Sequence, residues 1–174
     1  MSPKRARTSD AADRVDDVVA AWRRERPDID VSSIAVLTRA LLIGRNLQKA
    51  RDRALRELGT DTPTLEVLAT LRRSGAPYRL RTSEIEAATS VTAGAISQRL
   101  DRLEARGLVR RTRNDRDKRV VHVSLTKKGR DLIDAVVARL MERESRLLAP
   151  FNERERKALE KLLTRWLRWF EADR

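Results

Sequence analysis

The chain has 174 residues, 40% of them hydrophobic, which predicts one folded domain or one subunit of an oligomer. It carries 39 Lys and Arg against 26 Asp and Glu, and the resulting net charge of +13 indicates a polyanionic partner. Because there is no cysteine and only one histidine, the sequence excludes disulfides and predicts no metal site and no cofactor. We find no signal peptide and no run of about 18 apolar residues, so we expect a cytoplasmic protein without a membrane partner.

The first 60 residues predict a basic tail and two helices. Residues 1–9 are polar and are expected to be disordered. From Asp10, apolar residues at helical spacing predict a helix that ends before Pro27. A longer helix is predicted from about Ser33 to Leu58, because its apolar positions fall mainly on one stripe and a glycine follows.

A third helix, a linker and a short helix follow. Thr62 is the expected N-cap of the third helix, with a proline at its first helical position, and Gly75 ends it. Residues 76–81, APYRLR, predict a linker or a short strand. Ser83 and Glu86 have the spacing of a capping box and predict the start of the next, short helix.

The segment that follows predicts a helix and a hairpin. Residues 92–107, TAGAISQRLDRLEARG, form a helical pattern that a glycine ends. In residues 108–126, two strand-like runs flank a turn made almost wholly of charged residues, which predicts a β-hairpin. Thr126 can cap a helix through Leu148, and a last helix is predicted from about Asn152 onward.

The order of these elements predicts the fold class. A short helix, a turn, a helix with a polar outer face and a two-stranded hairpin are typical of a winged helix-turn-helix. We therefore expect a mainly α protein with a small β-wing, made of a winged helix-turn-helix DNA-binding lobe and a helical dimerisation region. In such a lobe the second helix enters the major groove of DNA and the wing contacts the backbone or minor groove.

The helix at residues 92–107 has a polar side opposite its apolar side. At about 100° per residue, Gln98 and Arg102 face away from the apolar residues, where Gln98 can contact adenine and Arg102 guanine or phosphate. Gly94 and Ala95 are small enough for close approach to DNA. Two hydroxyl residues, Thr92 and Ser97, can reach phosphates near the helix N-terminus.

Positive charge is concentrated around this helix and the hairpin. Residues 97–130 contain twelve Lys and Arg against four Asp and Glu, so about a fifth of the chain holds most of the net charge. Like charges close together destabilise a hairpin, which indicates that an external anion binds them. The predicted DNA contacts of the wing are Arg113, Arg116, Lys118 and Arg119. The alternative is a polar surface that is simply solvated.

Arg99 differs from these cations because it falls on the border of the apolar side of its helix. An arginine in this position is expected to point back into the domain and to need an anionic partner there. The lone histidine, His122, is expected in the middle of a strand, as a cross-strand pair or a phosphate contact rather than a metal ligand.

The terminal helices predict a homodimer. Five of the six aromatic residues lie there, far in sequence from the basic segment: Trp22, Phe151, Trp166, Trp169 and Phe170. The last two helices carry more apolar surface than a small winged-helix lobe can cover, and a two-fold partner would bury it. The alternative is that these helices pack on their own lobe.

These residues resemble the MarR family of bacterial transcription regulators. The motifs that carry the resemblance are SQRLDRLEARGLVRR, the wing pattern Asp117-x-Arg119, and the Leu-Thr-x-x-Gly pattern after the wing, formed by Leu125, Thr126 and Gly129. In order and helix count it covers roughly residues 35 to 170. The resemblance implies a homodimer that places two winged helices on a pseudo-palindromic operator in double-stranded DNA. It also implies release of DNA when a small phenolic or anionic ligand binds.

The added N-terminal helix and the segment LATLRRSGAPYRL are similar to the urate-responsive, PecS-like branch of this family. The resemblance implies a ligand site made of Trp22, Glu66, Arg99 and Arg111, with Glu66 at a position where the branch has Asp. The implied effector is urate or another anionic aromatic compound. Two alternatives remain open, in which Trp22 anchors helix packing and Arg99 forms a structural ion pair with Glu66.

Four regions follow from this interpretation. They are a disordered basic tail (1–9), N-terminal helices that contribute to dimerisation and to the ligand-pocket side (10–60), the winged helix-turn-helix lobe (61–126) and C-terminal dimerisation helices (127–174). We expect a ligand-responsive, sequence-specific DNA-binding regulator that acts as a repressor. The alternative is an architectural DNA-binding protein with little sequence specificity. An enzyme is not expected, because the sequence contains no catalytic motif.

Overall fold

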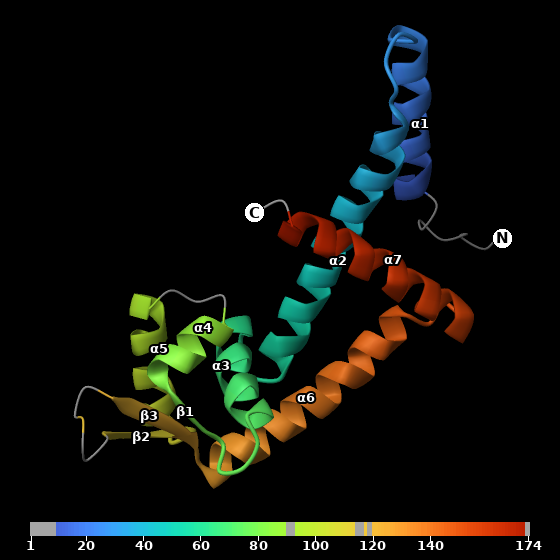
Figure 1. Ribbon diagram of the computed structural model, residues 1–174. Coiled ribbons are helices and arrows are strands. Elements are labelled where there is room, and N and C mark those ends of the chain that lie inside the picture. Colours follow the sequence, from blue (N-terminus) through green and yellow to red (C-terminus); the bar gives the residue numbers. More distant parts are fainter. Residues whose placement is uncertain (1–9, 90–92, 114–116, 118–119, 173–174) are drawn as a thin grey trace, which may run out of the picture. The chain divides into compact units, whose positions relative to one another are not determined.

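The structure of the protein is a computed structural model that describes residues 10–89, 93–113, 117 and 120–172. The chain divides into two compact units, residues 1–51 and residues 52–174. Most of the residues are helical, and one small antiparallel sheet completes the fold (Figure 1). The predicted class, mainly α with a small β-wing, is confirmed.

The first unit consists of α1 (Asp10–Glu25) and most of α2 (Ser32–Glu57), whose bounds agree with the prediction within about two residues. Val15, Val19 and Val31 are buried in this unit. The helices are also joined by an ion pair, in which the guanidinium of Arg39 donates to the carboxylate of Asp16 at 2.8 Å.

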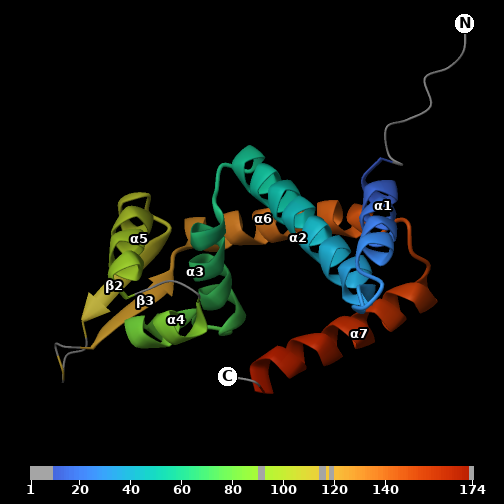
Figure 2. The same ribbon diagram turned by 90° about the horizontal axis from the view of Figure 1, so that it is seen from above.

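The second unit contains the remaining elements. In chain order they are α3 (Thr62–Arg73), β1 (Arg79–Arg81), α4 (Thr82–Ala88), α5 (Ala93–Ala105), β2 (Val109–Arg113), β3 (Val121–Leu125), α6 (Lys127–Leu147) and α7 (Glu153–Ala172). In both views α3, α4 and α5 lie together beside the sheet, and α6 leads away from it (Figure 2). The predicted succession of a short helix, a second helix and a β-wing is confirmed.

The sheet has three strands rather than the two of the predicted hairpin. Its order is β1-β3-β2, so that β3 pairs with both neighbours and Val123 lies opposite Leu80 on one side and Arg111 on the other. Residues 76–81, predicted to be a linker or a short strand, thus contribute a strand. The third strand attaches the wing to the start of α4, because β1 runs directly into that helix.

One hydrophobic core holds the lobe together. Leu68 and Leu71 of α3, Ile85 of α4, Leu100 of α5 and Val123 of β3 each have at most 1% of their surface exposed. Since α6 adds Ile133, Val136 and Leu140 to the same core, that helix is fixed to the lobe as far as Leu140. This packing determines which side of α5 can face outward.

Two helix starts differ from the prediction. The N-cap of α3 is Asp61 rather than Thr62, because the Asp61 carboxylate accepts a hydrogen bond from the Thr64 amide at 2.8 Å. The start of α4 is held by Glu84, which accepts from the Arg81 amide at 2.6 Å, rather than by the Ser83 capping box. Both shifts follow the same cause, since a carboxylate binds the exposed amides of a first helical turn more strongly than a hydroxyl does.

The C-terminal helices begin where the sequence predicts. The Thr126 hydroxyl oxygen accepts from the Gly129 amide at 3.0 Å and donates to the Gly107 carbonyl at 2.8 Å. One side chain therefore caps α6 and ties it to the turn that follows α5. Gly129 lies so close to this turn that a Cβ atom there would be 2.0 Å from the Leu108 carbonyl oxygen.

Large apolar side chains remain exposed on the C-terminal helices. No residue of α7 is buried, and Leu163, Trp169 and Phe170 have 46%, 61% and 51% of their surface exposed. Exposed patches of this kind mark interaction surfaces. Among the described residues, no helix is long and apolar enough to cross a membrane.

Candidate nucleic-acid interface

The outward face of α5 is polar, as the helical periodicity predicts. Ile96, Leu100 and Leu103 are buried in the core, while Gln98 and Arg102 on the opposite side are exposed. Gly94, Ala95 and Ser97 are exposed as well. The burial of α5 confirms which side chains point away from the lobe, and their contact with DNA stays a prediction. Thr92 lies outside the described residues.

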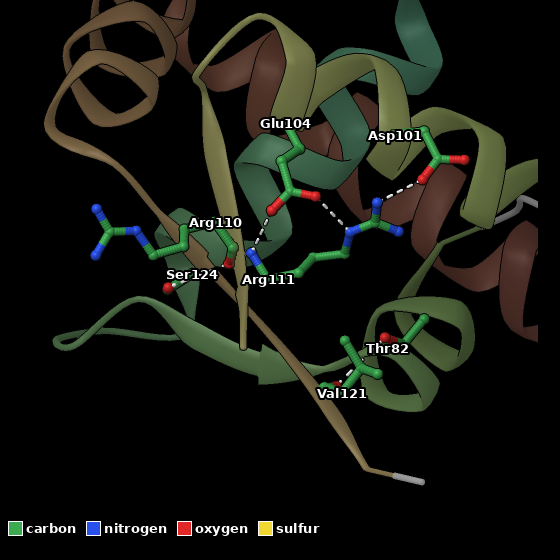
Figure 3. A network of polar contacts seen from close by, with 7 residues as sticks. All are labelled: Thr82, Asp101, Glu104, Arg110, Arg111, Val121 and Ser124. Atoms are coloured by element: carbon green, nitrogen blue, oxygen red, sulfur yellow. Dashed lines mark hydrogen bonds and ion pairs between the residues drawn. The ribbon is translucent and has the colours of Figure 1, made fainter. Parts of the chain in front are cut away.

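The wing presents cations beside this helix. Arg110 and Arg113 of β2 are exposed. The three remaining predicted wing contacts, Arg116, Lys118 and Arg119, lie outside the described residues. Two side-chain hydrogen bonds hold the strands of the wing. The Ser124 hydroxyl donates to the Arg110 carbonyl at 3.4 Å, and the Thr82 hydroxyl of α4 donates to the Val121 carbonyl at 3.3 Å (Figure 3).

Arg111 joins the wing to the recognition helix α5. Its backbone amide and its Nε both donate to the Glu104 carboxylate, at 2.8 Å each, and its Nη2 donates to Asp101 at 2.5 Å. The two carboxylates project from α5 and the arginine from β2, so the three side chains close the angle between helix and wing (Figure 3). We call this group, Arg111 with Asp101 and Glu104, the wing clamp.

The wing clamp supplies partners that the sequence does not predict for Arg111. The sequence places Arg111 among cations available to an external anion, and the structure pairs its guanidinium with Asp101 and Glu104. Binding of an external anion by Arg111 stays a prediction. The Arg111 amide and then its guanidinium lower the pKa of Glu104, and hydrogen bonding to Glu104 raises the pKa of Arg111. Both shifts favour the charged forms of Glu104 and Arg111.

The lowered pKa of Glu104 predicts an acid-dependent loss of stability. A carboxyl with a lower pKa in the folded state adds stability above its unfolded pKa of about 4.3, and that contribution disappears as pH falls through the folded-state value. Glu104→Gln is therefore expected to be less stable than the parent at pH 7, with the difference closing below about pH 4. Urea unfolding of both proteins between pH 3 and pH 7 measures this, and a constant difference would contradict it.

Arg99 also points back into the lobe, as its position at the border of the apolar side predicts. Its side chain is only 18% exposed, and its Nη1 donates to both Asp61 oxygens, at 3.0 and 2.8 Å, and to the Thr64 hydroxyl at 3.2 Å. Burial favours a raised pKa for Asp61, but the Thr64 hydroxyl, the Thr64 amide and Arg99 together lower it. The partner that the sequence requires for Arg99 is thus Asp61.

The alternative pairing of Arg99 with Glu66 is wrong. Glu66 is half-buried on α3, and the described residues include no ion pair between its carboxylate and Arg99 or Arg111. Trp22 lies on α1 in the other compact unit and is 46% exposed, so within that unit it is not a buried packing anchor. Arg99 lies on α5 itself, and Arg111 of β2 is bound to the same helix by Asp101 and Glu104.

An open cleft of about 480 Å³ lies between α4, α5 and the wing. Arg81 and Arg111 are the cations of its wall, and Ser97 adds a hydroxyl. The clamp arginine is thus reachable from solvent on the side that faces α4. His122 lies nearby in β3, opposite Arg81 and Thr112, and its Nδ1 is buried with no recorded hydrogen-bond partner in the described part of the chain.

Comparison with known proteins identifies the fold family. The MarR family profile matches residues 58–120, which span the lobe from the end of α2 to the wing. The transcriptional regulator PecS of Dickeya dadantii is 38% identical over 151 residues, which cover 87% of this chain and 91% of PecS. The chain belongs to the MarR family. The PecS-like branch is supported by this identity, and the transcriptional repressor MdtR of Bacillus subtilis is 31% identical over 72% of this chain and 77% of its own.

Several solved structures share the fold of this chain. YusO of Bacillus subtilis superposes with a TM-score of 0.62 at 28% identity, covering 79% of this chain and 94% of YusO. A MarR mutant of E. coli in complex with operator DNA gives 0.64 at 26%, covering 80% and 99%. BpsR of Bordetella bronchiseptica, whose DNA binding is regulated by 6-hydroxynicotinic acid, gives 0.56 at 24%, covering 72% and 98%, and shows the fold alone.

As a MarR-family member, the protein is a DNA-binding transcriptional regulator and not an enzyme. The winged-helix lobe is the element that this family shares with the chain in hand. The residues that sequence reasoning missed are Asp61, Asp101 and Glu104, which hold the two arginines. In the sequence these three residues are marked only as acids near several arginines. Ordinary surface ion pairs show the same pattern, so it does not identify the residues that hold Arg99 and Arg111.

Proposed function

We propose that this MarR-family regulator is a cytoplasmic, homodimeric repressor whose grip on a pseudo-palindromic operator is loosened by a small anionic aromatic ligand. The observation that carries the proposal is that carboxylates hold both Arg99 and Arg111. Arg99 belongs to the recognition helix α5, and Arg111 is bound to the same helix from β2. An anionic ligand offers the same chemistry as those carboxylates and competes for the guanidinium groups.

In the DNA-bound state, α5 lies in the major groove. Gln98 reads adenine and Arg102 reads guanine or holds a phosphate, while Gly94 and Ala95 allow the helix to approach closely. The hydroxyls of Thr92 and Ser97 bind phosphates. The wing residues Arg113, Arg116, Lys118 and Arg119 bind the backbone beside the groove.

The proposed dimer is supported by apolar surface that one copy leaves exposed. Leu162, Leu167 and Trp169 of α7 are each more than half exposed, and Val36, Leu41 and Ile43 of α2 are exposed in the other unit. We propose residues 10–60 and 127–174 as the dimerisation regions and residues 61–126 as the DNA-binding lobe. A two-fold axis then places two recognition helices about one DNA turn apart.

The ligand acts on the recognition helix through its arginines. When the ligand takes Arg111, Asp101 and Glu104 lose their partner, and the angle between α5 and the wing is no longer fixed. When it takes Arg99, α5 loses its attachment to the N-terminus of α3. Glu66 contributes to the site by accepting a hydrogen bond from the ligand.

Removal of the base-reading amide is expected to reduce specificity. Gln98→Ala should lower the preference for operator over random duplex about 10-fold, since a bidentate base contact contributes about 1–3 kcal/mol of discrimination. Its affinity for random duplex should change little, because it carries no charge. Fluorescence anisotropy with both duplexes measures the ratio, and an unchanged ratio removes Gln98 from the reading surface.

Removing the charge of Asp61, the N-cap of α3, and that of Glu66, within α3, is expected to have different effects on DNA binding. Asp61→Asn keeps a good N-cap for α3 but removes the charge that holds Arg99, so operator affinity should fall about 5-fold and stability by less than about 1 kcal/mol. Glu66→Gln should leave DNA binding intact and change only the response to ligand. Anisotropy and urea unfolding test both, and operator binding lost in Glu66→Gln alone would contradict the assignment.

The experiment that tests the proposal is a titration with the duplex upstream of the protein's own gene, with random duplex as control, at two salt concentrations. It is repeated with urate and with 6-hydroxynicotinic acid. Preference for the own-gene duplex that either compound abolishes supports the ligand-responsive repressor. Preference that both compounds leave intact supports the regulator and counts against these effectors. Equal affinity for both duplexes with a steep salt dependence favours an architectural protein.

A further inference from the structure

The last helix carries a row of cations that the recognition lobe does not use. Five side chains of α7 fall within an arc of about 80° on one side of the helix, at about 100° per residue. They are Arg154, Lys157, Lys161, Arg165 and Arg168, and we call them the α7 ridge. From first to last the ridge extends over about 21 Å, at 1.5 Å per residue.

The cations of the ridge are exposed and nearly all unpaired. All five are exposed, and only Lys157 has a recorded partner, the Glu153 carboxylate at 2.7 Å. For the other four, no hydrogen bond or ion pair is recorded within the described residues. Lys157, Lys161 and Arg165 follow one another at intervals of four, a spacing at which like charges destabilise a helix. A row that is unfavourable within the chain indicates an anion outside it.

The ridge lies on the side of α7 opposite its apolar face. Leu162, Leu163, Trp166, Trp169 and Phe170 occupy that other face. If a second copy of the chain covers the apolar face, the ridge stays at the surface. The ridge itself contains no apolar anchor residue, so its contact would be electrostatic and independent of sequence, as contacts to DNA phosphates are.

We propose that the α7 ridge binds the phosphate backbone of double-stranded DNA, as a second contact separate from the winged-helix lobe. Its length matches about six base-pair steps of 3.4 Å, and three of its five side chains are arginines, which bind phosphate with two parallel hydrogen bonds. While the lobes hold one duplex, the ridge holds a second duplex or a distant part of the same one. An anionic membrane is disfavoured, because the ridge has no apolar residue of its own that could enter the lipid.

The test measures whether the full-length protein bridges two duplexes. Two random-sequence duplexes, one with a donor and one with an acceptor fluorophore, are mixed with protein at about 50 mM salt, where phosphate contacts are strong. Energy transfer reports bridging, and anisotropy of one duplex alone reports binding by the lobes. Because random duplex is used, the result does not depend on the operator, on the ligand or on the repressor role.

The variant R154Q/K161Q/R165Q/R168Q is expected to lose bridging at least 10-fold and to keep most of its single-duplex binding. The control R23Q/R24Q/K49Q/R139Q has the same net charge but an intact ridge, and it should bridge as the parent does. The variant R154K/R165K/R168K keeps the charge and should keep bridging. If the fourfold variant loses helicity by circular dichroism, K161Q/R165Q replaces it, with a smaller expected loss.

Three outcomes would overturn the proposal. The first is that the parent protein gives no energy transfer between duplexes at any salt concentration tested. The ridge variant and the charge-matched control could bridge equally well, which would assign bridging to general charge. Binding of the parent, but not of the ridge variant, to phosphatidylserine vesicles in place of duplex would assign the ridge to a membrane surface.

Discussion

Gly129→Ala is expected to destabilise the winged-helix lobe by on the order of 3 kcal/mol. A Cβ atom at this position would lie 2.0 Å from the Leu108 carbonyl oxygen and 2.9 Å from its carbonyl carbon. Neither atom can move away freely, because Leu108 is buried and its carbonyl accepts from the Thr126 amide at 3.1 Å. The methyl group must therefore separate α6 from the turn that follows α5.

A second glycine provides the control for this prediction. Gly44 is also helical, and nothing lies within 4 Å of a Cβ atom built there. Gly44→Ala is therefore expected to stabilise the protein by up to about 1 kcal/mol, because alanine loses less backbone entropy in a helix. Urea unfolding at one protein concentration compares both variants with the parent. Similar stability of the two variants would show that α6 does not pack closely on the turn.

Glu104→Ala is expected to weaken operator binding although it removes a negative charge from a DNA-binding lobe. Charge alone predicts the opposite result, because less repulsion of phosphates strengthens binding to any duplex. Glu104, however, accepts two hydrogen bonds from Arg111 and fixes the wing against α5. We expect affinity for random duplex to stay the same or rise slightly, and the preference for operator to fall about 10-fold, the equivalent of about 1.4 kcal/mol.

The matched control removes an acid of the neighbouring helix α6 whose recorded partner is not in the wing. Asp131 accepts from Lys127 across one turn of α6, with both side chains more than half exposed. Asp131→Ala should raise affinity for all duplexes slightly and leave the operator preference unchanged. Anisotropy titrations of both variants with operator and random duplex separate the two effects. Operator preference retained in Glu104→Ala would show that the wing clamp does not position the wing.

The partner of Arg99 could not be predicted from the sequence. Helical periodicity places Arg99 at the border of the apolar side and predicts an acidic partner for it, but does not identify that partner. The structure supplies Asp61, which is 38 positions earlier in the chain. Glu66 was the less suitable candidate, because the cap of α3 rather than its body faces Arg99 once α3 and α5 pack on the shared core.

The third strand was equally hard to predict. Residues 79–81 are too few to show an alternating pattern, and they become a strand by pairing with β3. Short strands depend on their neighbours for hydrogen bonds, so their state is a property of the whole sheet. In contrast, the Thr126 cap and the ends of α1 and α2 were predictable, since they depend on side chains only a few positions apart.

The sequence by itself determined the helix order, the wing, the outward face of α5 and the concentration of positive charge that led to a DNA-binding regulator. These features follow from periodicity, turn residues and charge, which act over a few residues along the chain. Only the tertiary structure decided that Arg111 closes the wing clamp, that Asp61 holds Arg99 and that Gly129 contacts the turn after α5. These contacts join segments that packing of the core brings together, and spacing in the sequence carries no record of that packing.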